Sequence, residues 1–141
     1  YAAGGLVAPA RERTQAEQSR RELGIKAPSV LTRTGSLSGG NQQKVVLAKW
    51  LAMKPKVLIS DEPTRGIDVG AKAEIYRLMR GLADAGVPVL MISSDMEEVI
   101  GVSDRIAVMH EGRISGFLER ADFTEENVLT LAIGKQLRKA G

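Results

Sequence analysis

Two short apolar runs, each followed by a helical pattern, constrain the fold of this chain more than any other feature. The first run covers residues 57–59 and precedes a helical pattern over residues 71–85, and the second covers residues 87–92 and precedes one over residues 95–100. Strands that are joined through helices pair in parallel, and the helices cover the faces of the sheet. The order therefore predicts an α/β fold with two buried parallel strands.

The rest of the sequence contributes helices and one hairpin. Residues 106–109 and 113–118 flank His110-Glu111-Gly112, which predicts an antiparallel hairpin at the edge of the parallel sheet. The first ten residues show no usable periodicity. The remaining segments are expected to form a polar helix that ends before Gly24, a loop, a second helix and a C-terminal helix, over residues 11–23, 27–40, 41–53 and 127–137.

Composition excludes several kinds of chemistry. The 141 residues include no Cys and one His, so a thiolate nucleophile and a cysteine-ligated zinc are excluded, and His110 is expected to lie on the surface at its hairpin turn. The net charge of +3 arises in residues 1–40, which hold six basic and three acidic residues, and is interpreted as a solvated helix face. Aromatic residues make up only 4%, which disfavours a base-stacking surface for nucleic acid.

The first motif that suggests chemistry is Leu-Ser-Gly-Gly-Asn-Gln-Gln at residues 37–43. Gly39 and Gly40, at the start of a predicted helix, leave backbone N–H groups open to an anion, and the helix dipole adds partial positive charge there. Ser38 supplies a hydroxyl donor at the same point. The alternative interpretation is structural: Ser38 caps the helix and the glycines only permit a turn.

The second motif is a pair of carboxylates, Asp61 and Glu62, which follow the predicted strand at residues 57–59. Ligands bind at the carboxyl ends of the strands in parallel α/β sheets. Two adjacent carboxylates at that edge suit a ligand for a divalent metal and a residue that orients water for phosphoryl transfer. A solvated turn is the alternative, because Asp-Glu-Pro is also a plausible start for a loop.

These motifs stand in the order found in ATP-binding cassettes, and the sequence resembles the second half of one. Three stretches carry the resemblance: LSGGNQQK at residues 37–44, VLISDEPTRGIDVGAK at residues 57–72 and MISSDMEEV at residues 91–99. The similarity extends over residues 23–134. It is most specific to the second cassette of the double-cassette ATPases that drive bacterial sugar importers of the ribose, galactose and xylose type.

The resemblance implies a fold and a division of the chain. It implies an α/β core of the P-loop NTPase type, truncated so that the strand leading into the P-loop is absent. Residues 1–40 would be part of the helical subdomain with the signature loop, and residues 41–141 the C-terminal part of the catalytic core. Because the sequence does not begin with Met, we expect it to be a piece of a longer protein.

The resemblance also implies roles for individual residues. Asp61 would hold Mg²⁺ through water, Glu62 would polarise the attacking water, and Asp68 would communicate across a dimer of cassettes. Six positions would contact ATP, and these are Ser38, Gly39, Gly40, Gln42, Asp68 and Ser94. Those in the signature loop would close over the γ-phosphate of ATP that is bound to the partner cassette.

Two departures from the family pattern affect the expected activity. Ser94 stands where cassettes usually present a His to the γ-phosphate, and serine offers one donor and no positive charge. The sugar-importer group commonly has this substitution in its second cassette, and it suggests a weaker hydrolytic site. The pattern G-x4-G-K-S/T of a P-loop is missing from the sequence, so the chain alone is expected neither to bind ATP tightly nor to hydrolyse it.

The resemblance implies partners and a location as well. A second cassette and membrane permease subunits would be direct partners, a periplasmic sugar-binding protein an indirect one, and nucleic acid none. The location would be cytoplasmic, at the inner face of the cell membrane. An incomplete sheet would expose apolar edges, so self-association of the chain is expected. Two alternatives stay open: a non-catalytic half that supplies a signature face, and the ATPase head of a DNA-repair or chromosome-maintenance protein.

Overall fold

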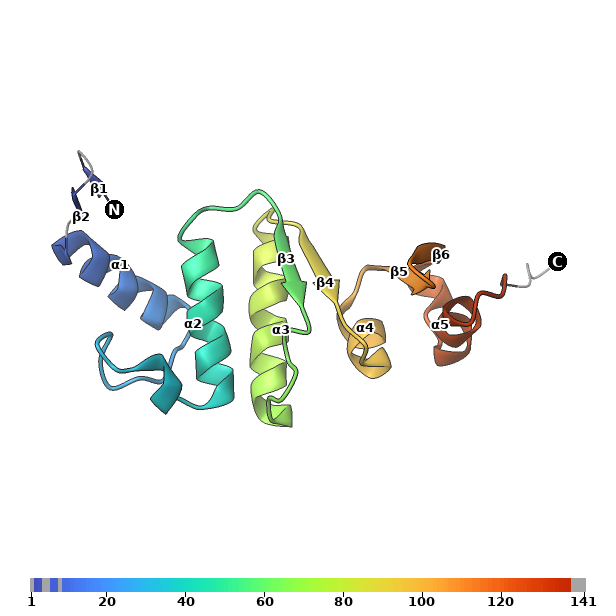
Figure 1. Cartoon of the computed structure of the whole chain (residues 1–141), viewed down its shortest axis with the longest axis horizontal. Helices are drawn as coiled ribbons and strands as arrows, with labels where there is room; N and C mark the ends of the chain where they lie inside the picture. The colour runs from blue at the N-terminus through green and yellow to red at the C-terminus, as the bar shows by residue number, and fades with distance from the viewer. Residues whose placement is uncertain (1, 4–5, 8, 138–141) are drawn as a thin grey trace. The chain divides into compact units, whose positions relative to one another are not determined.

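The computed structural model describes residues 2–3, 6–7 and 9–137 as two compact units (Figure 1). The first unit is Tyr1–Met91 and the second is Ile92–Gly141. The division expected at residue 40 stays a prediction. Among the described residues no helix is both long and apolar enough to cross a membrane.

The first unit begins with a short strand pair and a polar helix. The strands β1 (Ala2–Ala3) and β2 (Leu6–Val7) pair antiparallel, a feature that the sequence did not predict. Helix α1 (Pro9–Glu22) starts at a proline, which is favoured at the first helical position, and has no buried residue. Gly24 follows with a φ of +57°, as expected of a glycine that ends a helix. The solvated charged helix is therefore confirmed.

Two helices and two strands form the remainder of the first unit. After the 3₁₀ turn η1 (Thr34–Ser36), helix α2 (Gly39–Leu51) starts two residues before its predicted start and ends before Pro55. Strand β3 (Leu58–Asp61), helix α3 (Val69–Asp84) and strand β4 (Val89–Ile92) follow. The two strands run parallel as predicted, and the Leu58 N–H donates to the Pro88 carbonyl at 2.9 Å (Figure 1).

The prediction that these strands are buried is wrong for one of their faces. Along β3, Leu58 is 6% exposed whereas Ile59 is 65% exposed, and along β4 Leu90 is 53% exposed. Successive side chains of a strand point to opposite faces, so one face of the strand pair is covered and the other lies open. The structure thus exposes an apolar face of this strand pair, while the apolar edges expected of an incomplete sheet stay a prediction.

The second unit packs a hairpin against a helix. Strands β5 (Arg105–His110) and β6 (Arg113–Glu119) pair antiparallel with Ile106 opposite Leu118, as predicted. Glu111 and Gly112 form the turn with φ of +45° and +76°, the left-handed pair that a tight two-residue hairpin requires. Among the described residues this hairpin forms a two-stranded sheet of its own, and its expected place at the edge of the parallel sheet stays a prediction.

Short helices complete the second unit. They are α4 (Met96–Val102), the 3₁₀ turn η2 (Arg120–Asp122) and α5 (Glu125–Ala132). The hydrophobic core comprises Ile106, Val108, Leu118 and Leu131. Helix α5 ends earlier than predicted because Gly134 adopts a φ of +77°. Nδ1 of His110 lies 2.8 Å from the Ala132 carbonyl oxygen at the end of this helix, and the histidine is half-buried rather than fully on the surface as expected.

Candidate functional site

The start of helix α2 and the start of helix α3 meet at one end of the first unit, the end toward which β3 and β4 point (Figure 1). A Cβ placed on Gly40 would lie 2.6 Å from the Cβ of Ala71, and one on Gly39 would lie 3.8 Å from the Gly66 carbonyl oxygen. The structure therefore brings the glycine turn at residues 38–40 against the loop that contains Asp68. The sequence presents these as two separate motifs.

Gly40 is required by this helix contact. The residue is buried, and a Cβ there would also lie 3.9 Å from Cγ2 of Ile67. Only a residue without a side chain lets α2 approach α3 so closely. The glycine therefore has a packing role, in addition to the phosphate-binding role that the sequence suggests.

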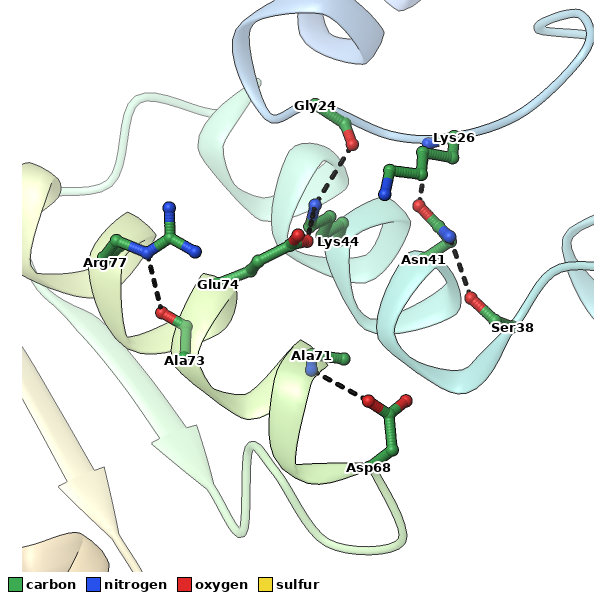
Figure 2. Close-up of polar contacts among 10 residues, drawn as sticks. All are labelled: Gly24, Lys26, Ser38, Asn41, Lys44, Asp68, Ala71, Ala73, Glu74 and Arg77. Carbon is green, nitrogen blue, oxygen red and sulfur yellow. Dashed lines mark hydrogen bonds and ion pairs between the residues drawn. The ribbon is translucent and has the colours of Figure 1, made fainter.

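Ser38 does not cap the helix that follows it. Its backbone is extended and it occupies the N-cap position of α2, but its side chain accepts no hydrogen bond from that helix's backbone. Instead Oγ accepts a hydrogen bond from Nδ2 of Asn41 at 2.8 Å (Figure 2). The interpretation of Ser38 as a simple helix cap is wrong, and the exposed hydroxyl remains beside the first N–H groups of α2.

Two amide side chains hold the glycine turn at residues 38–40, called the signature turn from here on, in shape. Asn41 accepts a hydrogen bond at Oδ1 from the Lys26 backbone N–H at 2.7 Å (Figure 2). Gln42 donates from Nε2 to the Leu37 carbonyl oxygen at 2.8 Å. The predicted ligand Gln42 is thus half-buried and folded back on its own loop, which leaves Oε1 as its second polar atom.

Lys44 is a buried cation that the sequence reasoning missed. Its Nζ lies 2.6 Å from Oε2 of Glu74 on α3 and donates to the Gly24 carbonyl oxygen, after the end of α1, at 3.1 Å (Figure 2). The hydrogen bond from Lys44, and then its charge, lower the pKa of Glu74. A signal was present, because Lys44 shares the helix face of the buried residues Gly40 and Leu47.

The carboxylates follow β3 as the sequence predicts, and one has an unusual backbone. Asp61 is the exposed last residue of the strand. Glu62 adopts a φ of +46°, in the left-handed region that non-glycine residues seldom enter. Pro63 and Thr64, both buried, anchor the chain directly after it. Such strain persists only where the surrounding structure imposes it, and it gathers at functional sites.

Asp68 begins helix α3. Its Oδ1 accepts a hydrogen bond from the Ala71 N–H at 2.9 Å, which satisfies one of the otherwise open donors of the first turn (Figure 2). Ala71 is the same residue that contacts the Gly40 position. The geometry of the Asp68 loop is therefore tied to that of the signature turn.

Ser94 belongs to the second unit, so its surroundings are those of that unit alone. It is exposed, between β4 and α4. Its neighbour Ser93 donates from Oγ to the buried carboxylate of Glu98 at 2.5 Å, and Asp95 caps α4 by accepting from the Glu98 N–H at 3.1 Å. These bonds fix the chain on both sides of Ser94.

The donor set suits Mg²⁺ only together with a phosphate. Among the described residues no group of three His, Cys, Asp or Glu side chains could hold a metal ion. Mg²⁺ commonly keeps several waters and binds through one or two carboxylates and the phosphates of its substrate. The exposed carboxylate of Asp61 fits that role, and the hydroxyl and N–H groups at the start of α2 fit phosphate oxygens.

A parallel strand pair whose first strand ends in carboxylates, beside a helix that starts at two glycines, fits an α/β protein of the nucleotide-binding cassette type. A sequence profile of the ABC transporter family matches residues 6–65. The chain belongs to the ATP-binding cassette family.

Curated relatives agree with this assignment. The ribose import ATP-binding protein of Lactococcus lactis subsp. cremoris is 62% identical over 121 residues, which cover 86% of this chain and 25% of that protein. The ribose import ATP-binding protein of Yersinia pestis is 52% identical over 130 residues, covering 92% of this chain and 26% of that protein. The chain thus spans about a quarter of the length of these relatives.

The structural neighbours show the fold. A metal-chelate type ABC transporter in an inward-facing conformation aligns with a TM-score of 0.78 at 20% identity, over 91% of this chain and 51% of that chain. A dimeric bacterial ABC transporter cassette aligns with a TM-score of 0.70 at 24% identity, over 84% of this chain and 51% of that chain.

Proposed function

We propose that this chain is part of the ATP-hydrolysing subunit of a sugar importer. The observation that supports it best is that the signature turn lies against the Asp68 loop, with an exposed serine hydroxyl that does not cap its own helix. The relatives named as ribose import ATP-binding proteins favour a sugar as the transported substrate.

In this proposal, the residues serve two composite sites. Ser38, Gly39 and Gly40 donate to the γ-phosphate of ATP on a second cassette, and Gln42 supports the turn that presents them. Asp68 lies at the junction between the two cassettes. Clamping two cassettes around ATP gives the closed state a lower free energy than the open one, and this difference drives the transporter.

The carboxylates serve the second of these sites. Asp61 is the ligand for Mg²⁺ through water. Glu62 accepts a proton from the water that attacks the γ-phosphorus, while the bond to the β–γ bridging oxygen breaks to give ADP and inorganic phosphate. The left-handed backbone of Glu62 turns the chain away from the line of β3 at this carboxylate.

The proposal is tested with this chain inside a complete protein. The matching 121-residue region of the Lactococcus lactis protein is replaced by that of this chain, and ATP hydrolysis is measured with its permease in membranes. Glu62→Gln is expected to lower turnover by at least about a hundredfold, within the range of one general base. Lys49→Gln, a change on the exposed side of α2, serves as the control. A Glu62→Gln protein with unchanged turnover would contradict the proposal.

The isolated chain, unlike the complete protein, is not an ATPase in this proposal. Because its sequence has no P-loop, it binds ATP only weakly and does not hydrolyse it, and calorimetric titration with Mg-ATP tests this. Micromolar binding would refute this part. Copies of the chain associate through the exposed apolar face that includes Ile59 and Leu90, which a concentration series in sedimentation velocity tests.

The proposed partners and location follow from the importer assignment. A second cassette and the permease subunits are direct partners, and a periplasmic sugar-binding protein acts through the permease. The subunit lies at the cytoplasmic face of the membrane. Nucleic acid is not a partner, so duplex DNA is expected not to bind at physiological salt.

Ser94 favours a second candidate function. A serine where an imidazole is usual stabilises phosphate charge less well, so this half would mainly supply its signature turn to a competent partner site. In the complete protein, Ser38→Arg would then lower ATP turnover more than Glu62→Gln does. The reverse order would favour a catalytic role for the half that contains Glu62.

A further inference from the structure

We infer that Asn41 is a positioning residue that keeps the Ser38 hydroxyl as a hydrogen-bond donor toward phosphate. The inference rests on the proposed function, because it concerns the same composite site. The sequence motif alone assigns no role to Asn41. Its contacts on both sides, with Lys26 and with Ser38, define that role (Figure 2).

The backbone of Lys26 distinguishes the two polar atoms of the Asn41 amide. The Lys26 backbone N–H can only donate, so the Asn41 atom that it meets at 2.7 Å must be the acceptor, Oδ1. The other atom of the amide, Nδ2, carries two protons and can only donate. The backbone of Lys26 therefore fixes which way the amide faces.

The amide in turn directs the proton of Ser38. Nδ2 of Asn41 lies 2.8 Å from Oγ of Ser38, so Oγ must be the acceptor in that bond. A serine has one hydroxyl proton, and in this arrangement the proton points away from Asn41. The hydroxyl is exposed and is not used to cap α2. Ser38 is thus held as a donor toward the space in front of the helix.

The groups that face the space in front of α2 are all hydrogen-bond donors, so the ligand that fits there is one that offers only acceptors. The first N–H groups of α2 are donors and carry the partial positive charge of a helix with 13 residues. With the Ser38 proton turned the same way, all of these groups are donors. A phosphate oxygen satisfies them, whereas an ammonium or an N–H group would not.

The position of Asn41 requires an amide rather than a carboxylate. An aspartate would have the same shape and would still accept from the Lys26 N–H. Its second oxygen would also be an acceptor, so Ser38 would have to donate to it, and the hydroxyl proton would be lost to the phosphate. The carboxylate would also repel the phosphate by its charge.

The first experiment needs no nucleotide and uses the chain as it is. In a ¹⁵N-labelled sample, the Asn41 side-chain amide protons are expected to be protected from exchange, and Ser38→Ala is expected to speed their exchange about fivefold, the factor of one neutral hydrogen bond. Asn127, which donates from Nδ2 to the Asp122 carbonyl oxygen at 2.8 Å, is the internal reference and should not change. Unchanged exchange at Asn41 would overturn the inference.

The second experiment measures ATP turnover in the complete chimeric protein as a double-mutant cycle. Asn41→Ala is expected to lower turnover about fivefold when Ser38 is present and to have no effect when Ser38 is already Ala. Asn127→Ala is the matched control in both backgrounds. An equal loss from Asn41→Ala in both backgrounds would show a merely structural role and overturn the inference. If Ser38→Ala itself leaves turnover unchanged, the proposed function fails instead.

Discussion

The contact between α2 and α3 at Gly40 makes a quantitative prediction. A Cβ at residue 40 would stand 2.6 Å from the Cβ of Ala71, and ordinary contact begins at 3.4 Å, so Gly40→Ala requires the two helices to separate by about 0.8 Å. Overpacking of this kind costs about 1–3 kcal/mol. The same substitution gains up to about 1 kcal/mol in helix propensity. The expected net effect is a loss of about 1 kcal/mol in the free energy of unfolding.

Urea unfolding followed by the fluorescence of Trp50, the single tryptophan, measures this change. Gly81→Ala is the matched control, because Gly81 lies in α3 with no atom within 4 Å of the place that a Cβ would take, and it should gain about 0.5–1 kcal/mol. Ala71→Gly opens the space, so Gly40→Ala should become stabilising in that background. If Gly40→Ala stabilises the protein as much as Gly81→Ala does, the packing argument is refuted.

Three further predictions concern charge, strain and exposed surface. Because the pKa of Glu74 is lowered in the folded state, its ion pair with Lys44 contributes to the free energy of unfolding above pH 4.5, its ordinary pKa, and this contribution is lost as the pH falls through the lower folded-state pKa. Lys44→Met should remove this pH-dependent part of the stability that urea unfolding measures. Glu62→Gly should raise the unfolding free energy by about 1 kcal/mol by relieving the left-handed backbone, and an unaltered urea midpoint would contradict it. Ile59→Lys should reduce self-association in sedimentation velocity without lowering the urea midpoint, since Ile59 is 65% exposed.

Local sequence signals were sufficient for most of the elements. Periodicity predicted α2 and α3, the stop signal at Gly24 supported the polar helix α1, and the runs that flank His110-Glu111-Gly112 predicted the hairpin, because these features depend on residues that are neighbours in the chain. The end of α5 was misjudged although a local signal marks it, because Gly134 follows the helix with a φ of +77°. His110 occupies the space around Gly134, and a Cβ there would lie 2.7 Å from the imidazole Cδ2.

The apolar pattern of the strands could not predict whether both of their faces are buried. An apolar run such as residues 57–59 shows that a strand can be covered on both faces, but whether it is covered depends on which other elements are present. Within the described part of the first unit, Leu58 is covered and Ile59 is not. The same limitation applies to the hairpin, whose pattern predicts its own pairing but not the sheet that it joins.

The candidate site shows the clearest difference between a motif and its geometry. The sequence places a serine before two glycines, and that pattern is equally compatible with a helix cap and with an anion site. The structure decides through Asn41, because its Nδ2 donates to one of the two acceptor lone pairs of Ser38 Oγ, and no backbone N–H of α2 donates to the other. Asn41 can do so only because the Lys26 N–H, 15 positions earlier in the chain, holds its Oδ1. The hydroxyl therefore becomes a donor through a tertiary contact, and no local motif contains that information.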